Sequence, residues 1–218
     1  FKEYNEKGHT NKEISSLIAK NMDIPSILKN ASMDWDGGYT MAGLIGHGDA
    51  FVLRDPNGIR PAFWYEDDEV LVVTSERPVI QTAFNVKWEN VNELKPGHAL
   101  IVKKDFELKE VEINSPSNLQ KCSFERIYFS RGTDKDIYKE RLMLGSLVTP
   151  QVLEAVNFDL KRTVFSFIPN TAEMSYYGMI KATEDYLSGV KKKKIQELEQ
   201  NDPKYQEKLD DILSISCL

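Results

Sequence analysis

A short apolar strand runs into a tight turn in the first half of the chain, which reads Phe51-Val52-Leu53-Arg54-Asp55-Pro56-Asn57-Gly58-Ile59-Arg60-Pro61. Pro at the second position and Gly at the fourth position of residues 55–58 are typical of a type I turn. Segments rich in β-branched and aromatic residues lie on both sides, at 39–45, 62–66, 70–76, 86–94, 98–104 and 106–113. Because connections this short permit only antiparallel pairing, we expect an antiparallel sheet covered by helices over 1–33 and 77–84.

The pattern changes after Ser115-Pro116-Ser117-Asn118, which predicts a linker over 115–121. A strand over 124–129, a helix over 137–156, a strand over 164–168 and a helix over 172–187 then follow. This alternation indicates βαβ units and a parallel sheet. The chain as a whole is therefore α+β in its first part and α/β in its second. The Lys- and Glu-rich residues after about 188 predict two solvated surface helices broken at Asp202-Pro203.

Composition excludes several classes of protein. The 218 residues carry a net charge of -6, which argues against a dedicated nucleic-acid binder, since such proteins present a basic face. No apolar run approaches the roughly 18–20 residues of a membrane span. Only two cysteines, Cys122 and Cys217, are present, so a disulfide framework is excluded and a reducing, cytoplasmic setting is expected.

The chemical candidates are few. The three histidines, His9, His47 and His98, have no carboxylate or cysteine at metal-ligand or triad spacing. Cys122 has neighbouring cations but no placed base, which favours a structural thiol. Thr171 follows an apolar strand and a Pro-containing turn at the start of a helix. It is either a plain helix cap or part of a phosphate-binding helix start.

An ordered set of motifs points to a family. It begins with Gly46-His47-Gly48 and the stretch 51–61 quoted above. It continues with Ser75-Glu76, Leu94-Lys95-Pro96-Gly97-His98-Ala99, Cys122-Ser123-Phe124-Glu125-Arg126-Ile127-Tyr128-Phe129-Ser130-Arg131, Tyr138, Arg141, Leu144-Gly145 and Ile168-Pro169-Asn170-Thr171. Over roughly residues 31–185 the chain closely resembles the amidophosphoribosyltransferases. Members of that family transfer ammonia from glutamine to phosphoribosylpyrophosphate, giving phosphoribosylamine in the first committed step of purine synthesis.

The resemblance implies a fold for each half. Residues 1–114 would be the later part of a type 2 glutamine amidotransferase domain, an N-terminal-nucleophile αββα sandwich. Residues 122–218 would be the beginning of a type I phosphoribosyltransferase α/β domain, with a charged helical insertion after about 188. Arg54, Asp55, Gly58 and Arg60 would hold the hairpin and inter-sheet packing together.

The resemblance also implies site residues and cofactors. Thr171, Asn170 and Tyr138 match substrate-binding positions, and Thr171 matches a magnesium contact, although the family prefers an acidic residue at position 170. Cys122 matches one ligand of a 4Fe–4S cluster that some members hold, and we expect no cluster here. The partners implied are glutamine and phosphoribosylpyrophosphate, with homo-oligomerisation and neither nucleic acid nor membrane.

Two parts of the family's machinery have no match in this sequence. The family's glutaminase nucleophile is an N-terminal Cys, whereas this chain begins with Phe1, and Asp210-Asp211 lacks the Gly-containing phosphate loop that should follow it. We therefore expect an internal piece of a longer enzyme, without catalytic residues, inactive alone and exposing an apolar face that favours self-association. The alternative is a catalytically dead homologue that acts as a binding or regulatory module.

Overall fold

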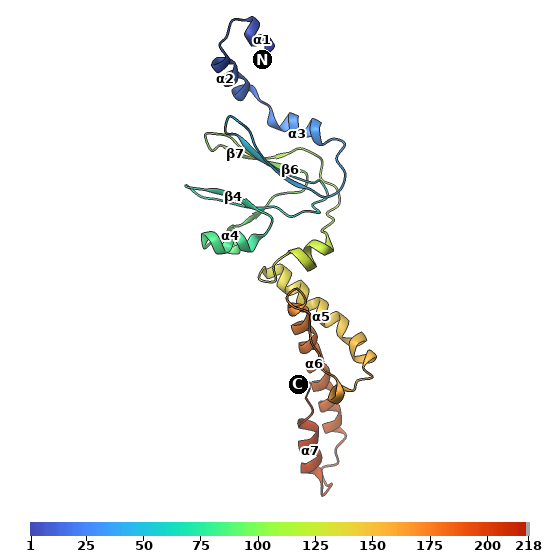
Figure 1. Cartoon of the computed structure of the whole chain (residues 1–218). Helices are drawn as coiled ribbons and strands as arrows, with labels where there is room; N and C mark the ends of the chain where they lie inside the picture. Colours follow the sequence, from blue (N-terminus) through green and yellow to red (C-terminus); the bar gives the residue numbers. More distant parts are fainter. Residues whose placement is uncertain (217–218) are drawn as a thin grey trace. The chain divides into compact units, whose positions relative to one another are not determined.

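The computed structural model describes residues 1–216, which form two compact units, Phe1–Glu125 and Arg126–Leu218 (Figure 1). Cys217 lies outside the described residues. No helix among the described residues is both long enough and apolar enough to cross a bilayer. The two domains assigned from the sequence, 1–114 and 122–218, stay a prediction.

The first unit contains two antiparallel sheets, whereas the strand pattern alone predicts one; the αββα sandwich that the resemblance implies has two sheets and stays a prediction. One sheet has the order β1-β2-β6-β7, and the other has the order β4-β3-β5. The strands of the first are β1 (Thr40–Leu44), β2 (Ala50–Arg54), β6 (His98–Val102) and β7 (Leu108–Glu112), and those of the second are β3 (Phe63–Glu66), β4 (Leu71–Thr74) and β5 (Asn92–Glu93). Leu53 of β2 lies opposite Met41 on one side and Ala99 on the other.

Alternating side chains of the four-stranded sheet enter two different apolar clusters, as a period of two requires. Leu53, Ala99 and Ile101 pack against Ile24 and Leu28 of α3 (Ile24–Ser32). Their neighbours along the strands, which include Val52 and Leu100, pack with residues in or directly beside the strands of the second sheet: Ala62, Trp64, Leu71, Val73 and Leu94.

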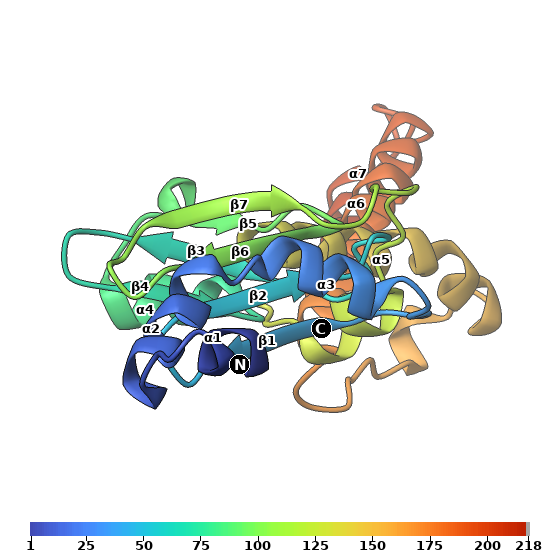
Figure 2. The same ribbon diagram turned by 90° about the horizontal axis from the view of Figure 1, so that it is seen from above.

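A helix covers the outer side of each sheet. In Figure 2, α3 lies across the four-stranded sheet, and in Figure 1, α4 (Arg77–Phe84) lies below the three-stranded sheet, which it contacts through β3 and β4. Ile80 of α4 is fully buried. The layers of the first unit therefore follow the order helix, sheet, sheet, helix.

Local signals fix the helix starts near the N-terminus. The helix α1 (Lys2–Glu6) precedes α2 (Asn11–Asn21), whose N-cap is Thr10. Thr10 and Glu13 form a capping box, in which each side chain bonds the other residue's backbone N–H. Asp23 caps α3, with Pro25 in its first turn.

Two predicted strands are wrong, and a third is much shorter than expected. Of 86–94 only the two residues of β5 form a strand, after a short 3₁₀ turn, η1 (Trp88–Asn90). Residues 124–129 contain a π-helical turn, η2 (Glu125–Phe129), and 164–168 is extended but unpaired. A strand needs a partner to satisfy its backbone groups, and no strand pairing occurs among residues 126–216, so the expected parallel sheet is absent there.

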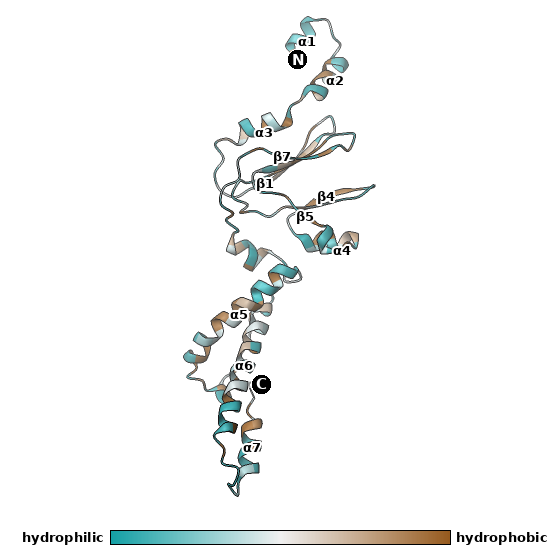
Figure 3. Cartoon of the chain, turned by 180° about the vertical axis from the view of Figure 1, so that it is seen from behind, coloured by the Kyte–Doolittle hydropathy of each residue, from teal (hydrophilic) through white to brown (hydrophobic). Residues whose placement is uncertain are grey.

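Helices build the second unit. They are α5 (Lys135–Ala155), the 3₁₀ turn η3 (Leu160–Arg162), α6 (Glu173–Gln196) and α7 (Tyr205–Leu213). The Lys-rich run 191–194 lies at the end of α6, a region that is teal, and so hydrophilic, in Figure 3. Several apolar side chains of α5 are exposed, among them Leu144, Leu147 and Val148.

Two glycines let α5 and α6 approach closely. A Cβ atom at Gly145 would overlap the carbonyl oxygen of Ser175, and one at Gly178 would overlap that of Leu142. The Ser146 hydroxyl donates across the crossing to the carbonyl oxygen of Gly178, at 3.2 Å. This crossing fixes the position of the first turn of α6 beside the first turns of α5.

Candidate functional site

A pocket of about 860 Å³ lies within the second unit, where the chain before α5 meets the starts of α5 and α6. One wall is the segment from Tyr128 to Thr133, another is the first two turns of α5, and a third is the stretch from Asn170 to Met174. The lining residues are Tyr128, Ser130, Arg131, Gly132, Thr133, Lys135, Tyr138, Lys139, Arg141, Asn170, Thr171, Glu173 and Met174.

The structure brings together the three substrate-binding residues expected from the sequence. Asn170, Thr171 and Tyr138 all line this pocket, although more than thirty positions separate Tyr138 from the other two. Tyr138 is 43% exposed, so its hydroxyl-bearing ring is open to a ligand. Their part in substrate binding stays a prediction.

Thr171 does not cap α6. The N-cap is Ala172, which has no side-chain oxygen, and no side chain caps this helix. Of the two interpretations open at the sequence level, the plain capping Thr is therefore wrong. Thr171 is half-buried on the pocket wall, directly before the helix start whose orphan N–H groups and dipole favour an anion.

The charge of the lining is strongly positive. Four cations, Arg131, Lys135, Lys139 and Arg141, line the pocket together with a single carboxylate, that of Glu173. Sequence reasoning missed these cations as site residues. The signal was present, because Arg131, Lys135 and Lys139 are spaced by four and the last two lie one turn apart on one helix face.

Arg141 and Asp134 hold the loop that forms the basic wall. Arg141 is buried and its Nη2 donates to the carbonyl oxygens of Arg126, Ile127 and Ser130, at 3.0, 2.8 and 2.6 Å. Burial lowers the pKa of the Arg141 guanidinium. Asp134, also buried, caps α5 by accepting from the N–H groups of Asp136 and Ile137.

The residues present do not by themselves make a metal or cluster site. No group of three or more His, Cys, Asp or Glu side chains within residues 1–216 could hold a metal ion. Mg²⁺ would find one carboxylate in the pocket, that of Glu173, and would need oxygens from a bound phosphate. Cys122 is a free, half-buried thiol. The magnesium contact of Thr171 and the cluster role of Cys122 stay predictions.

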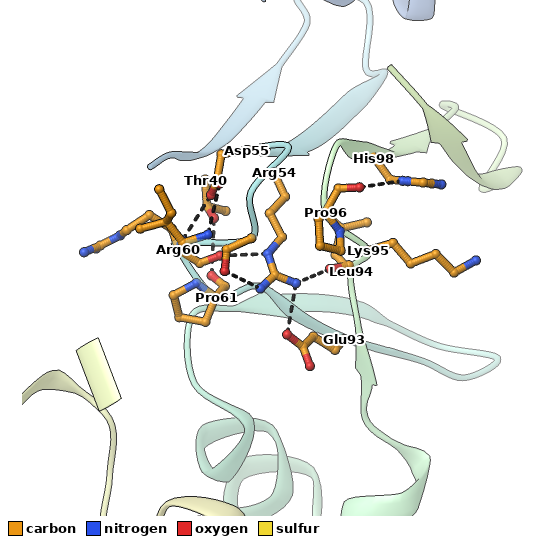
Figure 4. Close-up of polar contacts among 12 residues, drawn as sticks. Thr40, Arg54, Asp55, Arg60, Pro61, Glu93, Leu94, Lys95, Pro96 and His98 are labelled. Carbon is orange, nitrogen blue, oxygen red and sulfur yellow. Dashed lines mark hydrogen bonds and ion pairs between the residues drawn. The ribbon is translucent and has the colours of Figure 1, made fainter. Parts of the chain in front are cut away.

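In the first unit, the conspicuous charged motif holds the fold together. Figure 4 shows the Arg54 side chain donating through Nε to the backbone carbonyl oxygen of Arg60, a bond of 2.7 Å. Its Nη2 donates to the carbonyl oxygen of Gly58, at 3.2 Å. The Asp55 carboxylate accepts from the backbone N–H groups of Asn57, Ile59 and Arg60, at 3.0–3.1 Å. The structural role predicted for this motif is confirmed.

Comparison with known proteins gives named relatives. Amidophosphoribosyltransferase from Lachancea kluyveri is 31% identical over 163 residues, which are 70% of this chain and 31% of that protein. The Escherichia coli K12 protein of the same name is 30% identical over 148 residues, 62% of this chain and 28% of its own. The resemblance to amidophosphoribosyltransferase is confirmed. The chain spans about a third or less of the length of these relatives, and no family model matches it.

Solved structures agree with the fold. A glutamine phosphoribosylpyrophosphate amidotransferase from B. subtilis, complexed with ADP and GMP, aligns with a TM-score of 0.55 at 22% identity, covering 84% of this chain and 40% of that one. A structure described as the allosteric regulatory enzyme of purine biosynthesis gives 0.52, also at 22% identity, over 83% of this chain and 39% of that one. The chain therefore shares its mixed α/β fold with part of each of these two structures.

Proposed function

We propose that this chain serves the amidophosphoribosyltransferase reaction. Glutamine is hydrolysed to glutamate and ammonia, the ammonia attacks C1 of phosphoribosylpyrophosphate, and pyrophosphate leaves to give phosphoribosylamine. The family's motifs, in order along residues 46–171, and the named relatives support this proposal. In this view the first unit belongs to the amidotransferase αββα sandwich and the second to the start of the phosphoribosyltransferase domain.

The pocket of the second unit would contribute to the phosphoribosylpyrophosphate site. The observation that carries this assignment is the joint placement of Asn170, Thr171 and Tyr138 with four cations around one cavity. Pyrophosphate gains negative charge as it leaves, and preformed cations and N–H donors aimed at that charge lower the barrier. Mg²⁺ bound together with the diphosphate near Glu173 and Thr171 would supply further charge neutralisation there, and a homo-oligomer is expected for the working enzyme.

Direct binding tests this proposal. Inorganic pyrophosphate, with and without Mg²⁺, is titrated calorimetrically into the 218-residue chain and into the Thr171→Val and Asn170→Ala variants. We expect measurable binding that weakens at least fivefold in each variant, because each loses a polar group at the anion site. Ser188→Ala, an exposed change further along α6, is the matched control and should bind as the unmodified chain does.

The proposal fails if the unmodified chain does not bind pyrophosphate or if Thr171→Val and Asn170→Ala bind as the control does.

A further inference from the structure

The guanidinium of Arg141, on the second turn of α5, is buried without a charged partner among the described residues. Arg141 is 5% exposed, and no ion pair joins it to a carboxylate in the part of the chain that the structure describes. Its Nε has no hydrogen-bond partner, and the side chain lines the basic pocket. A buried, uncompensated cation is costly, and it calls for an explanation beyond packing.

The Arg141 guanidinium donates to three backbone carbonyls of one short segment. Nη2 donates to Arg126 and Ile127, in the turn η2, and to Ser130, where that turn ends. The end of a helical turn leaves carbonyl oxygens without intrahelical partners. Arg141 supplies those partners from a different helix, so that it sets the path of the chain from 126 to 130.

The same segment continues directly into the pocket wall. Ser130, Arg131 and Gly132 line the pocket, and Asp134 then starts α5 as its N-cap. Gly132 packs closely, since a Cβ there would lie 3.3 Å from Met174 Cγ and 3.5 Å from Arg141 Nη1. The wall is thus held at one end by Arg141 and at the other by Asp134.

We propose that Arg141 is a positioning residue for the anion site, because it holds residues 126–132 in the one path that presents Ser130, Arg131 and Gly132 to a diphosphate-bearing ligand. This inference rests on the proposed function of the pocket. A pre-set wall lowers the ordering cost of binding, and the unpaired charge of Arg141 adds to the attraction for the anion. The charge is held by carbonyl dipoles rather than by a carboxylate, which would cancel it.

The test combines local order with binding. Arg141→Met and Arg141→Lys are compared with Lys181→Met, an exposed cation on α6, in the full chain. Hydrogen exchange followed by mass spectrometry reports the amides of 126–132, and calorimetry reports the affinity for inorganic pyrophosphate. Far-UV circular dichroism establishes that each variant is folded.

We expect exchange in 126–132 to be at least tenfold faster in Arg141→Met, with at least tenfold weaker pyrophosphate binding. Arg141→Lys keeps an ammonium with three donors, so both quantities should stay within threefold of the unmodified chain. Lys181→Met should change neither, since about eight residues of helix, roughly 12 Å, separate it from the pocket.

Two results would overturn the inference. One is unchanged exchange in 126–132 in a folded Arg141→Met variant, and the other is an Arg141→Lys variant as impaired as Arg141→Met, which would leave Arg141 a packing role only. If Arg141→Met does not fold, Arg141→Lys decides alone by the same threefold criterion. Absence of pyrophosphate binding in the unmodified chain would overturn the proposed function, whereas the exchange comparison would still judge the positioning role.

Discussion

In the first unit, Nη1 of Arg54 lies 3.0 Å from Oε1 of Glu93, so that an ion pair joins the end of β2 in one sheet to the end of β5 in the other (Figure 4). The Arg54 side chain is 2% exposed, and it also donates to the carbonyl oxygens of Arg60, Gly58 and Leu94. The two sheets are therefore fastened at one end by a single buried guanidinium as well as by the apolar residues between them.

Arg54→Met should destabilise the first unit by about 3 kcal/mol, because buried carbonyl oxygens and the Glu93 carboxylate lose their partner. Urea unfolding followed by tryptophan fluorescence measures this change, since Trp35, Trp64 and Trp88 all lie in the first unit. The control is Lys109→Met, which removes an exposed ion pair to Glu107 and should cost less than about 0.5 kcal/mol. Equal stabilities of the two variants would contradict the fastening role of Arg54.

Gly145→Ala should destabilise the second unit by about 2–3 kcal/mol, because the added Cβ meets the backbone of Ser175 and forces α5 and α6 apart. Thermal unfolding followed by far-UV circular dichroism measures the loss. Gly189→Ala, on α6 with no atom within 4 Å of the added Cβ, is the matched control. It should be neutral or stabilising by up to about 1 kcal/mol through helix propensity, and a similar loss in both variants would show that the crossing is not tight.

The buried Asp49 carboxylate should make the first unit sensitive to acid. Burial raises its pKa, but hydrogen bonds from Lys103, His47 and the backbone N–H of Lys104 outweigh burial and lower the pKa to about 2. A carboxylate with a folded pKa below its unfolded value of about 3.9 stabilises above pH 4, and the contribution is lost as the pH falls through 2.

Asp49→Asn should therefore lower the unfolding free energy by about 2 kcal/mol at pH 6 and by well under 1 kcal/mol at pH 2. Urea unfolding by tryptophan fluorescence at the two pH values measures this difference. Asp34→Asn, an exposed change in the same unit, should have less than about 0.5 kcal/mol of effect at either pH. A constant loss for Asp49→Asn across this range would contradict the linkage.

Glu173→Gln should strengthen pyrophosphate binding about two- to fivefold, because it removes the one carboxylate that lines the basic pocket. The Gln side chain retains an oxygen that can accept from the Tyr177 hydroxyl, as Glu173 Oε1 does at 3.0 Å, so the local structure should persist. Calorimetry at low ionic strength measures the gain. Glu184→Gln lies about 16 Å further along the same helix and should not change the affinity, whereas weaker binding in Glu173→Gln would argue for a Glu173 contact to a bound cation.

The sequence correctly predicted the strands that show an alternating apolar pattern and end at turns. Residues 50–54 and 98–102 alternate between two apolar faces and end at turns, and both are strands. Residues 124–129 and 164–168 have the same apolar and aromatic character, but they have no partner strand among the described residues. Strand formation depends on a remote partner, which composition does not reveal.

The residues of the candidate site divide in the same way into those that a local motif predicts and those that only the folded chain brings together. The motif Ile168-Pro169-Asn170-Thr171 singled out Asn170 and Thr171, whereas the cations opposite them went unnoticed. Arg131, Lys135 and Lys139 look like ordinary surface charges in a sequence, and only the α5–α6 crossing places them around the same cavity as Thr171. Arg141 likewise gains its meaning from contacts 11 to 15 residues away along the chain.

The sequence by itself determined the turn at 55–58, most of the strands and helices, and the resemblance to amidophosphoribosyltransferase, because these rest on short-range spacing and residue chemistry. Tertiary structure alone decided which strands of the first unit join which sheet, that Arg54 fastens the two sheets, and that Tyr138 and Thr171 line the same positively charged pocket. Those features depend on packing between residues 30 or more positions apart. The physical reason is that burial and hydrogen-bond partners are properties of the folded chain, not of any local stretch.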